Sequence, residues 1–335
     1  MSERPTVSIV MPTYDRQRFL LESVASIFSQ TFRDWELIVA DDGSGEPVLE
    51  YLTALERFDN VRVLRRAHSG NPGQVRNAAI AQARGAFVAF MDSDDVWLPT
   101  KLAIQVALLR AERECEWCYT AFVIVDAHGA PLPSESHRRW IAHSGDIFDQ
   151  VVRGQASIRT PAVVVRTELL RKAGAFDETL DCAEDYDLWA RLALRSPACV
   201  VDEPLVCVRR YARDDEREAG RAHVARDRSL QKLASELTGR RRALVLAERS
   251  RNALARAETL VARGGRWRGV GVVASSLSFG WRYPSWWFGA AKVLVRACLS
   301  RPGAQAEPIS VAGSSPNTVE ARVERAGDEA GAVDR

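Results

Sequence analysis

The stretch FVAFMDSDD, residues 87–95, joins a short apolar run to a cluster of acidic side chains. The run at 87–91 has the length and composition of a buried strand. The carboxylates of Asp92, Asp94 and Asp95 follow directly, and like charges this close repel one another unless a cation or solvent screens them. Such a cluster is typical of a solvated turn before a helix. It is equally typical of a magnesium or manganese site, because these hard cations prefer oxygen ligands.

The composition narrows the classes to which this protein can belong. Its 335 residues are 46% hydrophobic and 27% charged, which predicts a globular protein with one large α/β domain and an appendage. A net charge of +2, without a basic stripe of interleaved aromatic residues, argues against a nucleic-acid partner. The first residues, MSERP, lack the charged and apolar regions of a secretory signal, so a cytoplasmic location is expected.

Six cysteines are scattered along the chain, at positions 115, 118, 182, 199, 207 and 298. Their spacing is not that of a small disulfide-rich scaffold, which predicts reduced thiols. Cys115 and Cys118 match the pattern C-x-x-C, but no second pair completes a zinc site. Packing is therefore the favoured interpretation of this pair.

Strand-like and helix-like segments alternate through the first hundred residues. Runs of β-forming residues at 7–11, 36–40, 61–64 and 87–91 are followed by helical spacing at 19–28, 47–55, 74–83 and 99–109. This alternation predicts a parallel, doubly wound sheet with right-handed crossovers. Ligands of such sheets bind beyond the carboxyl ends of the strands, so residues 12–14, 41–42 and 92–95 are expected to meet at one edge.

The middle of the chain is less regular. Its patterns predict a strand at 116–125, a buried strand at 158–165, a short helix at 168–173 and a final strand or strand pair at 199–208. A further helix carries Glu184, Asp185 and Asp187 in its first turn. The helix dipole favours carboxylates there and is expected to keep them ionised. Capping of the helix is the alternative role for these side chains.

The C-terminal part changes in character after Arg209. Residues 229–263 predict an amphipathic helix with a break at Thr238 and Gly239. A segment that is both aromatic and basic follows, with Trp267, Trp281, Tyr283, Trp286, Trp287 and Phe288 among Arg266, Arg268, Arg282, Lys292 and Arg296. Packing on the protein and attachment to an anionic membrane face are both consistent with this segment, which has no apolar run of the ~20 residues that span a bilayer. Residues 301–335 predict a disordered tail.

Six motifs together resemble the inverting family 2 glycosyltransferases with the GT-A fold. In chain order they are VMPTY (10–14), VADDGS (39–44), GQVRN (73–77), MDSDDVW (91–97), FDE (176–178) and EDYDLWAR (184–191). The resemblance covers residues 6–211. It implies a GT-A domain at 1–211, with a mostly parallel α/β sheet flanked by helices, followed by a helical extension at 212–300 and the tail at 301–335.

The resemblance also implies roles for individual residues. The donor, a nucleotide-diphosphate sugar, would be held by Pro12, Thr13, Tyr14, Asp41, Asp42, Arg76, Asp92 and Ser93. Manganese or magnesium would be held against the diphosphate by Asp92, Asp94 and Asp95. Asp185 would act as the general base that takes a proton from the acceptor hydroxyl.

The implied reaction is metal-dependent transfer of one sugar, with inversion, to a saccharide or lipid-linked saccharide in cell-envelope polysaccharide or glycolipid synthesis. The Q-x-x-R-W element of processive synthases is absent after Arg209, which favours a single transfer over chain extrusion. A cytoplasmic protein, peripheral on the inner face of the membrane, fits this role. A catalytically degenerate nucleotide-sugar-binding or scaffold protein is the alternative. A nicotinamide dehydrogenase is disfavoured, because no G-x-G-x-x-G turn follows the first strand.

Overall fold

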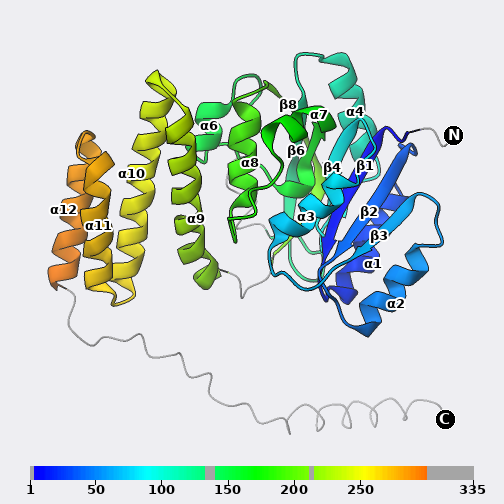
Figure 1. Cartoon of the computed structure of the whole chain (residues 1–335), viewed down its shortest axis with the longest axis horizontal. Coiled ribbons are helices and arrows are strands. Elements are labelled where there is room, and N and C mark those ends of the chain that lie inside the picture. Colours follow the sequence, from blue (N-terminus) through cyan, green and yellow to red (C-terminus); the bar gives the residue numbers. More distant parts are fainter. Residues whose placement is uncertain (1–3, 133–139, 211–214, 300–335) are drawn as a thin grey trace, which may run out of the picture.

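The computed structural model describes residues 4–132, 140–210 and 215–299 (Figure 1). Within them, one eight-stranded sheet has the order β3-β2-β1-β4-β7-β6-β8-β5. The strands are β1 Val7–Thr13, β2 Trp35–Asp41, β3 Val61–Arg65, β4 Phe87–Phe90, β5 Val96–Trp97, β6 Trp117–Val125, β7 Val163–Arg166 and β8 Ala198–Arg209. The parallel pairing of β3, β2, β1 and β4 confirms the prediction for the first hundred residues.

The other half of the sheet is mixed. Strand β7 runs antiparallel to both β4 and β6, and β5 runs antiparallel to β8. The strand predicted at 158–165 begins only at Val163, because a 3-10 turn, Thr160–Ala162, precedes it. Pro161 has no N–H to donate to a ladder, and its carbonyl instead accepts a bond of 2.9 Å from the Trp97 indole.

Helices cover both faces of the sheet. Those of the N-terminal half are α1 Gln17–Phe28, α2 Glu46–Leu55, α3 Pro72–Ala81 and α4 Lys101–Ala111, and those of the middle are α6 Phe148–Val152, α7 Thr167–Ala173 and α8 Glu184–Ala193. Side chains alternate along β1, so that Ile9 joins the core cluster of α1, α2 and α4 while Val10 joins that of α3, α7 and α8. Each face of the sheet therefore has its own apolar core.

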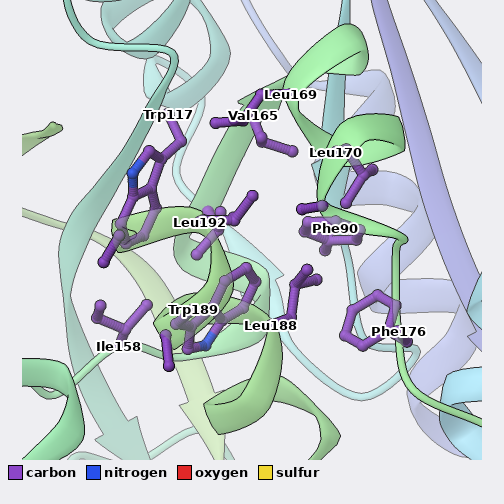
Figure 2. Close-up of a cluster of buried hydrophobic side chains, with 14 of the residues drawn as sticks. Phe90, Trp117, Ile158, Val165, Leu169, Leu170, Phe176, Leu188, Trp189 and Leu192 are labelled. Carbon is purple, nitrogen blue, oxygen red and sulfur yellow. The ribbon is translucent and has the colours of Figure 1, made fainter. Parts of the chain in front are cut away.

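The second of these cores fixes the position of α8. Figure 2 shows Trp189 of α8 surrounded by apolar side chains from the sheet and from neighbouring helices. Its ring stacks on that of Trp117 at a centroid distance of 6.2 Å and lies 5.9 Å from that of Phe90. Because Trp189 is 2% exposed, α8 is anchored one turn after its acidic residues.

Four long helices follow the sheet: α9 Asp215–Glu236, α10 Gly239–Ala262, α11 Arg266–Gly280 and α12 Pro284–Leu299. The predicted break lies between α9 and α10. The charged stretch after residue 211 is helical from Asp215. Leu230 and Val245 belong to the same core as Trp189, so α9 and α10 extend that core. The boundary at residue 211 stays a prediction, and the tail predicted at 301–335 lies outside the described residues.

The cysteine prediction is wrong for one pair. Cys115 and Cys199 form a disulfide, with their Cα atoms 5.8 Å apart. Cys115 precedes β6 and Cys199 lies in the neighbouring strand β8, so sheet pairing brings together residues 84 positions apart. Cys118, the other half of the C-x-x-C pattern, is a buried free thiol, as expected for packing.

Candidate functional site

A cavity of about 390 Å³ opens where β1, β2 and β4 end. Its lining includes most of the predicted donor and metal residues, namely Pro12, Thr13, Tyr14, Asp42, Arg76, Asp92, Ser93 and Asp94. The carboxyl-edge rule thus brings together segments some eighty residues apart in sequence. Asp41, Asp95 and Asp185 are not part of this lining.

One wall of the cavity carries aromatic rings and a polar group without a partner. The Tyr14 and His68 rings stack at a centroid distance of 4.1 Å, and both side chains are about half exposed. Thr13 is 3% exposed, and its hydroxyl oxygen has no hydrogen-bond partner among the described residues. Such an orphaned hydroxyl at a cavity wall is suited to bond a ligand.

The two acidic residues that end β2 have different surroundings. Asp42 accepts hydrogen bonds of 2.9 Å from the backbone N–H groups of Ser69 and Gly70. Burial opposes its ionisation, but these bonds outweigh burial and lower the pKa of Asp42. Asp41 is 1% exposed and accepts a bond of 3.2 Å from the N–H of Ser44. Asp41 therefore holds the turn behind the cavity, and contact with a nucleoside stays a prediction for it.

The three aspartates of the acidic cluster at 92–95 also have different surroundings. Asp92 and Asp94 face the cavity with side chains 26% and 18% exposed. Asp95 is 3% exposed and accepts a bond of 2.7 Å from the N–H of Arg209, at the end of β8. Burial, with the charges of Asp92 and Asp94, raises the pKa of Asp95 well above its usual value.

These residues fit a divalent cation through two of the three predicted ligands. Among the described residues, no three side chains of metal-ligating type converge. Magnesium and manganese are usually held by one or two carboxylates together with substrate phosphates, and Asp92 and Asp94 meet that requirement. Asp95 is directed towards β8, so its role as a ligand stays a prediction.

Arg76 of α3 links this cluster to the acidic start of α8. One guanidinium nitrogen lies 2.6 Å from an Asp92 oxygen, and another lies 2.8 Å from a Glu184 oxygen. The Arg76 side chain is 8% exposed. Burial disfavours its charge, but the two carboxylates outweigh burial and raise its pKa. A single buried cation thus fixes Asp92 relative to Glu184.

Asp185 lies next to Glu184 in the first turn of α8. Burial and the charge of Glu184 raise its pKa to about 6, although the Tyr186 N–H donates to it at 2.6 Å. Burial and the neighbouring charge therefore oppose the ionised form that the helix dipole was expected to favour. Ala183, just before the helix, has a left-handed backbone with φ of 54°. That sparsely populated conformation is held in place directly before the two carboxylates.

Residues 8–173 match the family model described as glycosyl transferase family 2. The chain belongs to this family. The model's range ends before α8, so the acidic start of that helix lies outside the match.

Curated relatives include proteins with named roles. The chain is 33% identical to the O-antigen biosynthesis protein RfbC of Myxococcus xanthus, over 58% of its own length and 15% of that protein. It is 36% identical, over 31% of its length and 40% of the relative, to the Escherichia coli protein WfgD, named as a UDP-Glc:alpha-D-GlcNAc-diphosphoundecaprenol beta-1,3-glucosyltransferase. The chain spans only 15% to 33% of the length of the first curated relatives it matches.

Solved structures confirm the GT-A fold. Residues 1–349 of S. aureus TarS with UDP-GlcNAc superpose with a TM-score of 0.67, at 19% identity over 87% of this chain and 89% of that one. The mannosyltransferase PcManGT of Pyrobaculum calidifontis, with GDP-Man and Mn2+, gives 0.59 at 16% identity, over 89% and 87%.

Sequence reasoning did not assign several residues of this family 2 site. The cavity lining also includes Arg16, His68, Gly70, Asn71, Pro72 and Val75. Arg16 lies 3.2 Å from Asp94. Their positions in the sequence indicate this site, because Arg16 follows β1 and residues 68–72 follow β3, at the edge of the sheet where ligands bind.

Proposed function

We propose that this protein transfers one sugar, with inversion, from a nucleotide-diphosphate sugar to an acceptor hydroxyl. The observation that carries the proposal is the Arg76 bridge between Asp92 and Glu184, at 2.6 and 2.8 Å. It couples carboxylates suited to a metal-diphosphate group with the acid pair that contains the candidate base. A protein that only bound nucleotide sugar would not need the second half of this arrangement.

The cavity has the groups that a nucleoside diphosphate requires. The Tyr14 and His68 rings offer an aromatic surface to a base, and the unpartnered Thr13 hydroxyl offers a hydrogen bond. Asn71 and Pro72, at the N-terminus of α3, line the cavity, so the positive end of that helix lies beside it. Negative phosphate groups are favoured at such an end.

Asp92 and Asp94 would hold manganese or magnesium in this site. When bound, the cation supplies neutralisation of the negative charge that builds on the departing nucleoside diphosphate. Arg76 orients Asp92, and Arg16 lies beside Asp94, so both carboxylates are positioned before the donor arrives. Arg76 also brings a positive charge close to the leaving group.

Asp185 is the general base in this proposal. With a pKa of about 6, it is ionised at neutral pH and still basic enough to accept a proton from an acceptor hydroxyl. The acceptor oxygen then attacks the anomeric carbon from the face opposite the leaving group. That geometry inverts the anomeric centre.

The acceptor class is inferred from the relatives. RfbC is named for O-antigen biosynthesis, TuaG of Bacillus subtilis for teichuronic acid biosynthesis, and WfgD for transfer to a sugar on diphosphoundecaprenol. We infer that this chain acts in cell-envelope polysaccharide or glycolipid synthesis, on a saccharide or lipid-linked saccharide at the cytoplasmic side of the membrane. A degenerate nucleotide-sugar-binding scaffold is the second candidate, and turnover separates the two.

Calorimetry with UDP, GDP and dTDP, with and without manganese, tests the donor site. We expect one nucleotide to bind in a metal-dependent way that Asp94→Ala abolishes. Asp59→Ala is the matched control, because Asp59 is an exposed carboxylate in the turn between α2 and β3. Hydrolysis of the matching nucleotide sugar, lost in Asp185→Asn, then tests turnover. Binding without hydrolysis or transfer would favour the scaffold, and no binding of any nucleotide would refute the donor site.

A further inference from the structure

The last two helices expose an unusual share of the protein's large apolar side chains. Eight of the thirteen exposed ones among the described residues lie between positions 267 and 299, and they are Trp267, Leu277, Trp281, Trp287, Phe288, Leu294, Val295 and Leu299. Phe288 is 80% exposed and Leu299 is 78% exposed. Isolated exposed apolar residues are normal on protein surfaces, but a concentration of this kind marks an interaction surface.

Helix α12 is apolar on two opposite faces. The inner face, with Trp286, Ala290, Val293 and Ala297, is buried against α10 and α11. The outer face carries Phe288, Val295 and Leu299 at i, i+7 and i+11, with Trp287 and Leu294 beside them. Figure 1 places α12 at the edge of the molecule furthest from the sheet. No described element packs on its outer face, although an all-round apolar helix is normally buried.

The charge of this region is of one sign. Residues 264–299 contain Arg266, Arg268, Arg282, Lys292 and Arg296, and no aspartate or glutamate. Lys292 lies four positions after Phe288 and Arg296 lies eight positions after it. Both therefore follow one edge of the apolar stripe on α12. The segment 264–299 therefore carries five positive charges and no negative one of its own, and Lys292 lies 3.1 Å from Glu258 of the neighbouring helix α10.

We propose that the outer face of α12, with the turn at Trp281 and Arg282, docks on an anionic lipid membrane. Indole rings and cationic side chains around an apolar stripe suit the interface between headgroups and acyl chains. No helix among the described residues is long and apolar enough to cross a membrane, so the helix lies along the surface. Charge favours lipid over a second copy of the chain, because a symmetric contact would bring two strongly positive faces together.

The proposal concerns binding and stands apart from catalysis. If the proposed transfer to a lipid-linked acceptor also holds, docking would keep the enzyme on the surface where that acceptor lies. Vesicle binding needs neither a donor nor a metal, so failure of one proposal is distinguishable from failure of the other.

Sedimentation of the full chain with vesicles tests the surface. We expect binding to phosphatidylcholine vesicles that contain phosphatidylglycerol, weakening as salt is added, and little binding to phosphatidylcholine alone. Phe288→Ser with Leu299→Ser should weaken binding about a hundredfold, since each substitution costs about tenfold when the side chain can no longer enter the interface. Lys292→Gln with Arg296→Gln should weaken it about thirtyfold, at about fivefold per charge.

Phe58→Ser is the matched control. Phe58 is 48% exposed in the turn after α2, and its loss should leave vesicle binding unchanged, because α2 and α12 lie at opposite ends of the molecule (Figure 1). Melting temperatures within a few degrees of the wild type show that each variant is folded. Wild-type protein that fails to bind anionic vesicles overturns the proposal. Sedimentation velocity that finds a dimer, dispersed by the Phe288 and Leu299 changes, assigns the face to a second copy instead.

Discussion

Glu184→Gln is expected to move the acid limb of the transferase pH profile to lower pH. The pKa of Asp185 stands at about 6 rather than near 3.8, with burial as the largest cause and the Glu184 charge as the next. Burial is the larger of the two causes, so the variant should lower the limb only part of the way towards the usual carboxyl pKa, with each pH unit corresponding to about 1.4 kcal/mol. The change keeps the shape of the side chain and removes only its charge.

The sign of this shift is well defined. Loss of the Glu184 carboxylate removes a repulsion that disfavours ionised Asp185. It also leaves Arg76 with one carboxylate partner fewer, which strengthens its attraction for Asp185. Both effects stabilise the ionised base, so the limb should move from about pH 6 towards the range typical of an exposed carboxyl group.

The assay is kcat/KM for donor turnover from pH 4.5 to 8, with saturating manganese. Glu178→Gln serves as control, because this exposed carboxylate bonds to Asn77 on the same helix α3 but lies outside the cavity. Its limb should coincide with that of the wild type. A Glu184→Gln limb that stays in place, or moves to higher pH, would show that Asp185 is not the group titrating in the rate.

Three further predictions concern stability. Trp189→Ala should cost about 3–5 kcal/mol in urea unfolding, because a 2% exposed ring leaves a cavity under α8. Burial lowers the pKa of Lys101 to about 7, so between pH 7 and 10 this lysine is protonated in the unfolded chain but not in the folded protein. The free energy of unfolding of the wild type should therefore rise with pH over this range, and Lys101→Met should remove that rise. An unchanged slope would refute that assignment. Cys115→Ser should cost about 2–4 kcal/mol in oxidised protein and nothing once reductant is added to both forms, because the bridge to Cys199 closes a long loop.

The sequence predicted those parts of the fold that depend on local periodicity. Strands β1 to β4 and helices α1 to α3 were placed within a few residues, because apolar spacing reports which face of each element is buried. Their order then implied a parallel sheet, and the parallel sheet implied the ligand edge. Asp42, Asp92 and Asp94 meet at that cavity as expected.

The rest depends on pairings between distant segments. Strand β5 is only two residues long and exists because Val96 and Trp97 pair with β8, more than a hundred residues later. The disulfide likewise forms because β6 and β8 pair side by side in the sheet. No local pattern in the sequence encodes which strands become neighbours in the mixed half of the sheet, so these features required the structure.

The acidic cluster shows why adjacent identical residues can differ in role. Asp94 faces the cavity, while Asp95 lies next to β5 and bonds the N–H of Arg209 on its pairing partner β8. Ser23 in α1 also donates to the Asp95 carbonyl at 2.6 Å, so both the backbone and the side chain of Asp95 are fixed from behind. Rigid support of this kind gives Asp92 and Asp94 their positions without a bound cation. The repulsion within the cluster, which first suggested a metal, acts on the buried member, because burial and the charges of Asp92 and Asp94 raise the pKa of Asp95 well above its usual value.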